Sequence, residues 1–222
     1  AFMDKYEVLK QYFGYDAFRD GQEKMIDAIT SGRDVLGIMP TGAGKSLCYQ
    51  IPALMAGENG GITLVISPLI SLMKDQVSAL NQAGVHAYLN SSLTPRQYYK
   101  ALGYAREGRY PIIYVAPERL LTPEFLDFAV HAKIAMVAVD EAHCVSQWGQ
   151  DFRPGYLKIE EFLCTLPKRP VVSAFTATAT AEVRDDIIDL LKLQDPVVTT
   201  TGFDRPNLYF EVQSPKDKYA AV

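Results

Sequence analysis

The chain has 222 residues, of which 48% are hydrophobic and 22% charged, an ordinary composition for a globular protein with one sizeable α/β core. Its formal net charge of −4 argues against nucleic-acid binding driven by bulk charge, so any such contact must be local. Three widely spaced cysteines without a Cys-x-x-Cys pair indicate neither a disulfide framework nor a zinc site and fit a reduced cytosolic setting. No apolar run is long enough to cross a membrane.

Two helices are predicted before the first strand. Tyr6, Leu9 and Phe13 recur at helical spacing within residues 4–13, and Asp20 opens a second helix that runs to residue 29. From residue 35 onward, short apolar strands alternate with helices. The predicted strands cover residues 35–39, 63–66, 86–90, 112–115, 134–139, 171–175 and 197–201. The predicted helices cover residues 45–55, 69–82, 95–106 and 179–191, with shorter helical stretches after residues 117 and 122 and within 156–166.

This alternation predicts an α/β fold with a mostly parallel sheet and helices on both faces. In such sheets, ligands bind beyond the carboxyl ends of the strands. We divide the chain into two N-terminal helices (1–33), an α/β domain (34–201) and an exit linker (202–222), where the alternation stops. Because the chain ends just after this linker, we expect a second domain beyond it.

A glycine-rich turn follows the first predicted strand. Glycines within residues 42–44 let the backbone approach phosphate oxygens, and Lys45 and Ser46 come next, at a helix N-terminus that favours anions. Their ammonium and hydroxyl groups suit a triphosphate and its Mg²⁺. The usual phosphate-loop spacing would need a glycine where this chain has Met39, so the match is a variant. An ordinary strand-to-helix turn is the alternative.

Two carboxylates follow the predicted strand 134–139. Asp140 suits a metal ion, and Glu141 suits an attacking water molecule. A solvated acidic loop is the alternative for this pair alone, but together with Lys45 the pair predicts hydrolysis of a nucleoside triphosphate. Two residues further on, His143 could hydrogen-bond to another motif and relay the nucleotide state.

Gln22 lies at the start of the second predicted helix, and its amide offers the donor and the acceptor that complement the edge of adenine. Tyr15 could stack on the face of the base. The spacing alone favours a different interpretation, in which Gln22 is a surface residue and Tyr15 is half-buried.

Six segments of the chain stand in an order typical of one protein family. They are YFGYDAFRDGQ (12–22), MPTGAGKS (39–46), SPLISLMKDQV (67–77), YVAPERL (114–120), DEAHCVSQW (140–148) and FTATAT (175–180). Together they closely resemble the first motor domain of RecQ-family DNA helicases, members of helicase superfamily 2, over residues 6–210. The resemblance implies a three-layer, RecA-like P-loop NTPase fold. It also accounts for Met39, since helicases of this type do not require the first glycine.

The resemblance implies roles for the residues of an ATP site. ATP and Mg²⁺ are the implied ligands, with Lys45 and Glu141 in the catalytic roles and with Ser46 and Asp140 on the metal ion. The residues implied in ATP binding are Tyr15, Arg19, Gln22, Thr41, Gly42, Ala43, Gly44, Lys45 and Ser46. The residues implied in coupling the nucleotide state to a neighbouring motor domain are His143, Thr176 and Thr178.

Residues 144–154 resemble the aromatic-rich loop with which this family senses single-stranded DNA. Aromatic and arginine side chains can stack on bases beside the hydrolytic site, although Trp148 could instead anchor the core under a loop. Hydroxyl, amide and backbone N–H groups can bind DNA phosphates without adding net positive charge. The residues implied in DNA binding are Ser67, Pro68, Ser71, Asn90, Ser91, Arg119, Gln147, Trp148, Phe152 and Arg153.

The resemblance thus predicts the ATP-binding half of a 3′–5′ DNA helicase that acts on single-stranded and duplex DNA, in the cytoplasm, at a bacterial nucleoid or in a eukaryotic nucleus. A second RecA-like domain in cis would supply an arginine finger, so we expect the chain alone to bind ATP–Mg²⁺ weakly and not to unwind DNA. Zinc is not expected, because the resemblance covers the first motor domain and not the family's zinc-binding part. An RNA helicase of the same superfamily and a non-catalytic nucleotide-binding module remain alternatives.

Overall fold

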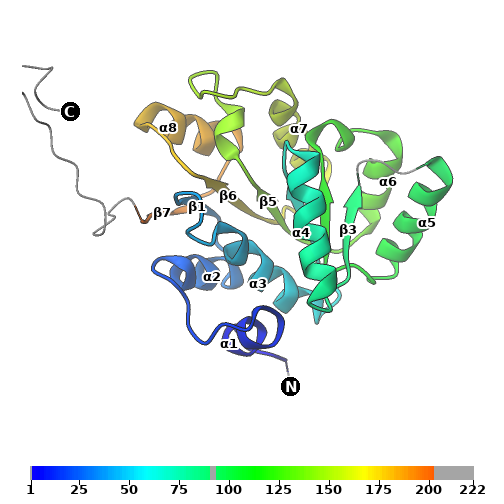
Figure 1. Ribbon diagram of the computed structural model, residues 1–222. Helices are drawn as coiled ribbons and strands as arrows, with labels where there is room; N and C mark the ends of the chain where they lie inside the picture. Colours follow the sequence, from blue (N-terminus) through cyan, green and yellow to red (C-terminus); the bar gives the residue numbers. More distant parts are fainter. Residues whose placement is uncertain (1, 91–93, 203–222) are drawn as a thin grey trace, which may run out of the picture.

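The computed structural model of the protein describes residues 2–90 and 94–202. Over these residues, seven strands form one sheet in which every neighbouring pair is parallel (Figure 1). In their order across the sheet, the strands are β3 (Ala87–Asn90), β4 (Ile112–Val115), β2 (Ile62–Ile66), β5 (Ile134–Val139), β6 (Val171–Thr176), β1 (Val35–Ile38) and β7 (Val197–Thr200). The predicted parallel sheet is confirmed, and the end of each strand differs from its prediction by no more than one residue.

Helices cover both faces of the sheet and make it the middle of three layers (Figure 1). One face is covered by α1 (Lys5–Val8), α2 (Gln22–Thr30), α3 (Lys45–Gly57) and α4 (Ile70–Gln82). The other face is covered by α5 (Pro95–Arg106), α6 (Pro123–His131), α7 (Lys158–Thr165) and α8 (Ala181–Leu190). A buried apolar cluster fills each interface. Neighbouring residues of β1 alternate between the two clusters, since Val35 belongs to the first and Leu36 to the second.

Aromatic rings form much of the core on the α5–α8 side. Phe125 lies 5.7 Å from Phe128 and 5.8 Å from Phe162, measured between ring centroids, and all three side chains are fully buried. Burial of one such side chain contributes roughly 1.5–3 kcal/mol. Because Val137 and Val139 of β5 belong to the same cluster, these rings hold α6 and α7 against the strand that leads to the predicted carboxylate pair.

The N-terminal segment departs from the single regular helix that the sequence predicts for residues 4–13. Only α1 is α-helical, and a π-helix, η1 (Leu9–Phe13), continues it. The π turn holds more residues than an α turn, and the spacing of three apolar side chains does not distinguish the two. Leu9 is buried, whereas Tyr6 lies at the surface with its ring 5.4 Å from that of Phe18.

The order of the strands brings the predicted motifs to one edge of the sheet. β5, β6 and β1 are neighbours, so the segments that follow their carboxyl ends meet there, while β3, β4 and β2 form the adjoining part of the same edge. Within the described residues, no helix is long and apolar enough to cross a membrane.

Candidate nucleotide and nucleic-acid site

The loop between β1 and α3 has the backbone of a phosphate-binding turn. Gly42 and Gly44 have φ values of 83° and 85°, in the left-handed region that favours glycine. A Cβ atom on Gly44 would lie only 2.3 Å from the side-chain nitrogen of Gln22, so this position also needs glycine for space. α3 begins at Lys45, so the positive end of the helix dipole faces the loop. Thr41 is exposed at the tip, and Ala43 is half-buried.

The Lys45 ammonium group folds back over this loop. Its Nζ donates to the carbonyl oxygen of Met39, at 3.1 Å. The residue that replaces the first glycine of the usual motif is itself fully buried in the core under α3. Met39 therefore contributes packing and a backbone acceptor, neither of which requires glycine.

The two predicted carboxylates stand at the end of β5 in different environments. Asp140 is only 5% exposed, and burial, followed by the charge of Glu141, raises its pKa to about 6. Its Oδ1 accepts a hydrogen bond from the backbone N–H of Glu141, at 3.0 Å. Glu141 is half-buried and has a φ of 49°, an uncommon conformation for a residue with a side chain.

A buried carboxylate next to a second one fits a hard divalent cation, because the ion supplies the charge that burial otherwise makes costly. Asp140 and the hydroxyl of Ser46, in the first turn of α3, are oxygen donors of the kind that Mg²⁺ prefers. The two motifs lie close enough for the positive charge of Lys45 to act on Asp140, in the direction that lowers its pKa. The donor set thus fits the predicted Mg²⁺.

His143 connects the carboxylate pair to the end of β6. Its Nδ1 lies 2.8 Å from the hydroxyl oxygen of Thr176 and 3.4 Å from Oε2 of Glu141. The Thr176 hydroxyl donates its hydrogen to the carbonyl oxygen of Thr178, at 3.1 Å, so it accepts from His143, whose Nδ1 then carries the proton. Thr176 also accepts from the backbone N–H of Met39 through its carbonyl oxygen, at 2.9 Å. Thr178 takes part through its backbone.

A cavity of about 250 Å³ adjoins the phosphate loop on the side of α2. It is lined by Phe13, Tyr15, Ala17, Arg19, Gln22, Gly44, Ser46, Leu47 and Gln50. Gln22 is 1% exposed, so the interpretation of a surface glutamine is wrong. Its amide accepts from the backbone N–H of Arg19, at 2.8 Å, and donates to the carbonyl oxygen of Gly44, at 3.0 Å.

The other two residues predicted for the adenine end also reach this cavity. The Arg19 guanidinium donates to the carbonyl oxygen of Gly42, at 2.7 Å, and so ties the segment before α2 to the phosphate loop. Tyr15 is 52% exposed at the cavity's mouth, more open than the half-buried tyrosine of the alternative interpretation. Gln22, Arg19 and the phosphate loop thus form one hydrogen-bonded unit beside an open aromatic ring.

The aromatic loop (144–154) follows the carboxylate pair. Trp148 is 74% exposed, which contradicts the alternative of a core anchor, and Gln147 is exposed beside it. Phe152 and Arg153 are half-buried. One guanidinium nitrogen of Arg153 donates to the carbonyl oxygen of Pro68, at 3.4 Å, so the loop reaches the segment that follows β2.

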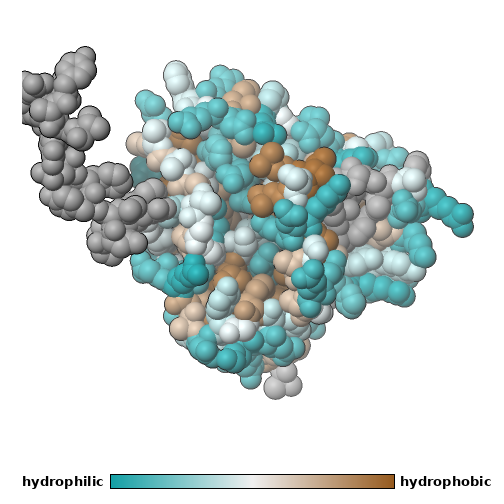
Figure 2. Space-filling view, viewed as in Figure 1, coloured by the Kyte–Doolittle hydropathy of each residue, from teal (hydrophilic) through white to brown (hydrophobic). Residues whose placement is uncertain are grey.

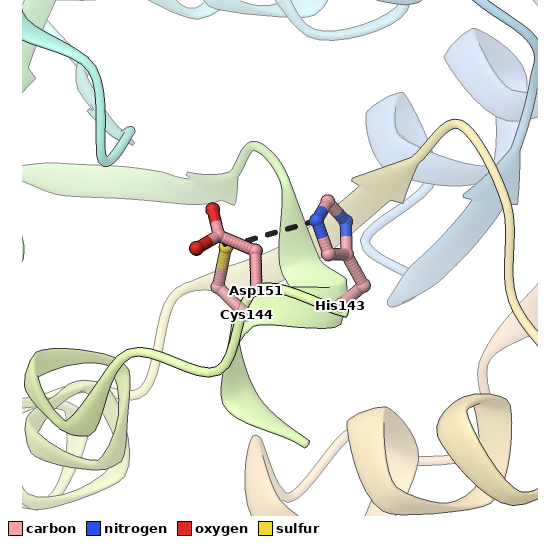
Figure 3. A group of neighbouring side chains, drawn as sticks. All are labelled: His143, Cys144 and Asp151. Atoms are coloured by element: carbon pink, nitrogen blue, oxygen red, sulfur yellow. Dashed lines mark hydrogen bonds between the residues drawn. The ribbon is translucent and has the colours of Figure 1, made fainter. Parts of the chain in front are cut away.

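Three side chains at the base of this loop offer potential metal-ligand atoms. His143, Cys144 and Asp151 bring a nitrogen, a sulfur and an oxygen within 4.8 Å of one another (Figure 3). Burial, followed by the charge of Asp151, raises the pKa of the Cys144 thiol to about 12, so the thiol stays protonated. Two guanidinium nitrogens of Arg153 contact Asp151 at 3.0 and 3.1 Å. The negative charge of Asp151 is therefore balanced by Arg153, without a metal ion.

The remaining residues predicted to bind DNA follow β2, β3 and β4. Ser67 is buried at the end of β2, and within the described residues its hydroxyl has no hydrogen-bond partner. Ser71, in the first turn of α4, and Arg119, in the short helix η2 (Pro117–Arg119), are exposed. Asn90 ends β3, and Ser91 lies outside the described residues.

An exposed apolar surface accompanies these polar groups. Figure 2 shows hydrophobic atoms gathered near the upper end of α4, where Leu69 and Ile70 are 44% and 43% exposed. The edge of the sheet is thus divided. The predicted phosphate and metal residues follow β1 and β5, and the predicted adenine residues precede β1. The predicted DNA residues outside the aromatic loop follow β2, β3 and β4. The aromatic loop follows β5 and reaches the segment after β2 through Arg153.

Sequence reasoning missed two supports of this site. The buried hydroxyl of Tyr156 donates to the backbone carbonyl oxygen of Asp140, at 2.7 Å. On α8, Asp186 accepts a hydrogen bond at 2.6 Å from the hydroxyl of Ser146 in the aromatic loop. These partners are 16 and 40 residues apart in the chain, and neither spacing carries a signal that could have revealed the contact.

Residues 19–187 match a protein-family model described as DEAD/DEAH box helicase. The chain belongs to the DEAD/DEAH box helicase family. Over 213 residues it is 50% identical to the ATP-dependent DNA helicase RecQ of Bacillus subtilis (strain 168), an alignment that covers 95% of this chain and 36% of that protein. It is 45% identical over 209 residues to the bifunctional 3′-5′ exonuclease/ATP-dependent helicase WRN of Mus musculus, covering 92% of this chain and 14% of that protein.

These relatives confirm the resemblance to RecQ helicases. This helicase-family chain spans about a third of the length of the bacterial RecQ proteins it matches. The crystal structure of the Hef helicase domain of Pyrococcus furiosus superposes with a TM-score of 0.64 at 19% identity, covering 82% of this chain and 37% of that one. This likeness confirms the predicted RecA-like helicase fold.

Proposed function

We propose that the chain is the ATP-binding half of an ATP-dependent 3′–5′ DNA helicase, which couples ATP hydrolysis to movement along single-stranded DNA and to unwinding of duplex DNA. One observation carries the proposal. Thr176 is bonded both to His143, beside the carboxylate pair, and to Met39, at the start of the phosphate loop, and an exposed tryptophan lies in the adjoining loop. The RecQ relatives, named as ATP-dependent DNA helicases, support DNA as the partner. The proposed location is the cytoplasm, the nucleoid of a bacterium or the nucleus of a eukaryote.

In this proposal, each part of the nucleotide has its own partners. Adenine enters the cavity of Gln22, with Tyr15 over its face, and the phosphates lie on the backbone N–H groups of the turn and on Lys45. Glu141 orients the attacking water and accepts its proton. Ser46 and Asp140 would hold Mg²⁺, which, when bound, neutralises charge that develops on the phosphates.

The coupling to DNA runs along the edge of the sheet. Bases stack on Trp148, and DNA phosphates bind to polar groups at the ends of β2, β3 and β4. His143 and Thr176 transmit the arrangement of the aromatic loop to the carboxylate pair. An arginine from a second RecA-like domain in cis completes the site, so we expect the chain alone to bind ATP–Mg²⁺ weakly. We also expect it to hydrolyse ATP about 10³- to 10⁵-fold more slowly than the longer protein, which contains both motor domains.

The test separates binding from hydrolysis. A fluorescent ATP analogue with Mg²⁺ should bind the unaltered chain, whereas Lys45→Ala should weaken binding and Glu141→Gln should retain it. In the longer protein with its second motor domain, Glu141→Gln should abolish turnover. Stimulation of turnover by RNA oligonucleotides instead of DNA would favour the RNA-helicase alternative. A longer protein without turnover would favour a non-catalytic nucleotide-binding module.

A further inference from the structure

The hydroxyl of Ser146 is the central point of a short hydrogen-bonded chain. It donates to Oδ2 of Asp186 on α8, at 2.6 Å, and accepts from the backbone N–H of Trp148, at 3.1 Å. Ser146 is fully buried, and Asp186 is half-buried. A hydrogen bond to an ionised carboxylate is stronger than one between neutral groups, and solvent competes little for a buried donor. The backbone of Trp148 is thereby tied to α8 through one serine side chain.

The rest of the aromatic loop is folded tightly upon itself. The backbone N–H of Arg153 donates to the carbonyl oxygen of Cys144, at 2.9 Å, and closes the loop. The N–H of Gly149 donates to the carbonyl oxygen of Ser146, at 3.1 Å, and a Cβ at Gly149 would lie only 2.7 Å from the carbonyl oxygen of His143. Within the described residues, two side-chain hydrogen bonds join this loop to other parts of the fold. Arg153 contacts Pro68 after β2, and Ser146 contacts Asp186 on α8.

The place of Asp186 in the fold links this contact to the ATP site. α8 follows β6 after the short segment 177–180, and the Thr180 hydroxyl caps its first turn by accepting from the N–H of Val183, at 3.3 Å. The short helix η3 (Ala142–Val145), which carries His143, packs against both β6 and α8. Two side-chain bonds therefore join the same two segments: His143 with Thr176 near the carboxylates, and Ser146 with Asp186 near the tryptophan.

We propose that Asp186 is a positioning residue that fixes the aromatic loop on α8, so that base stacking on Trp148 is transmitted to the β6–α8 junction and from there to His143. The part of this proposal that concerns DNA rests on the proposed function, whereas the anchoring of the loop does not. Without the Asp186 carboxylate, the loop keeps its internal bonds but loses its anchor on α8. Trp148 then moves independently of the helix, and its contact with a base no longer displaces the junction.

Trp148 is the only tryptophan of the chain, so its fluorescence reports on this loop alone. We would measure the time-resolved fluorescence anisotropy of Trp148 in the 222-residue chain, with folding checked by circular dichroism. Asp186→Ala and Ser146→Ala should each increase the fast local depolarisation, and the double variant should add little to either. Asp186→Asn, which keeps an acceptor oxygen, should fall between Asp186→Ala and the unaltered chain. Asp189→Ala, an exposed aspartate of the same helix, is the matched control and should change nothing.

A second measurement tests the transmission. Titration of the unaltered chain with oligothymidylate should quench Trp148, and Asp186→Ala should weaken this binding by about threefold to tenfold, because a larger fraction of loops is misplaced before binding. In the longer protein, the ratio of DNA-stimulated to basal kcat should fall by a similar factor at unchanged KM for ATP. If Asp186→Asn retains more of the stimulation ratio than Asp186→Ala, the hydrogen bond to Ser146 positions the loop. If both variants lose it equally, the effect does not depend on that hydrogen bond.

The outcomes are distinct. Equal anisotropy in folded Asp186→Ala and the unaltered chain would overturn the anchoring. If Asp186→Ala does not fold, Ser146→Ala and Asp186→Asn decide in its place, and unchanged anisotropy in both would overturn it equally. If Asp186→Ala frees the motion of Trp148 but leaves the ratio of DNA-stimulated to basal kcat unchanged, the proposed transmission from Trp148 to His143 is overturned. A tryptophan that does not respond to oligothymidylate in the unaltered chain would count against the proposed function, while the anisotropy would still test the anchor.

Discussion

The imidazole Nδ1 of His143 lies 2.8 Å from the hydroxyl oxygen of Thr176, which joins the segment after β5 to the end of β6. Through its carbonyl oxygen, Thr176 also accepts from Met39 at the end of β1. One threonine thus contacts two of the segments predicted to bind ATP and stands at the base of the helix that anchors the aromatic loop. A small displacement of β6 would therefore also move the phosphate loop, the carboxylate segment and α8, because packed strands and hydrogen-bonded loops do not deform independently.

Thr176→Val keeps the volume of this side chain but removes its hydroxyl. We expect a loss of about 1–3 kcal/mol in the free energy of unfolding, because the hydroxyl makes two hydrogen bonds and each usually contributes about 0.5–1.5 kcal/mol. We also expect a fall in the stimulation of ATP hydrolysis by DNA in the longer protein. Thr178 contributes its backbone carbonyl to this group, so Thr178→Val is the matched control and should leave both quantities nearly unchanged. An equal effect of the two substitutions would contradict the assignment of coupling to the Thr176 hydroxyl.

Asp140→Asn should make the metal-free chain more stable near neutral pH. The pKa of Asp140 is raised in the folded state to about 6, from an ordinary value of 3.8, so the stability that its proton contributes is present below about pH 4 and is lost as the pH rises through 6. A shift of this size corresponds to at most about 3 kcal/mol. Asparagine retains an acceptor for the N–H of Glu141 and carries no charge into the site.

Denaturant unfolding with a chelator present checks this prediction. The gain in stability of Asp140→Asn over the unaltered chain should be small at about pH 4.5 and larger at about pH 7.5. A gain that shrinks as the pH rises would show that the carboxylate is not destabilised by burial. Added Mg²⁺ and ATP should stabilise the unaltered chain more than the variant, because asparagine is the poorer ligand for the ion.

The parallel sheet could be predicted from the sequence because its strands are apolar on both faces and alternate with helices. The carboxylate pair and the phosphate turn could be placed at its edge for the same reason. Residue spacing alone did not decide the burial of Gln22 or the exposure of Trp148, since both follow from how distant segments pack. Only the resemblance to RecQ helicases favoured a ligand-binding role for each. The contacts of Tyr156 with Asp140 and of Ser146 with Asp186 join residues far apart in the chain, and the periodicity of the sequence does not predict them. The π-helix after α1 was missed because its apolar spacing is also compatible with an α-helix.

Trp148→Ala should leave the stability of the chain within about 0.5 kcal/mol of its original value, because the side chain is 74% exposed and removing it opens no cavity. In the longer protein, the ratio of ATP hydrolysis rates with and without single-stranded DNA should fall. Tyr99→Ala, at another exposed aromatic residue on α5, serves as the control and should preserve that ratio. Unchanged stimulation in Trp148→Ala would remove the proposed sensor role of the loop.

The purified chain should contain far less than one zinc ion per molecule, even though His143, Cys144 and Asp151 lie together (Figure 3). Zinc binding would require Cys144 to lose its proton, and burial raises the pKa of this thiol to about 12. It would also require Asp151 to exchange its contacts with Arg153 for the metal ion. Elemental analysis after dialysis against zinc checks the expectation, with Cys144→Ala as the matched control. A zinc content near one per chain that falls in Cys144→Ala would mean that the metal ion overcomes both costs and that this group is a binding site.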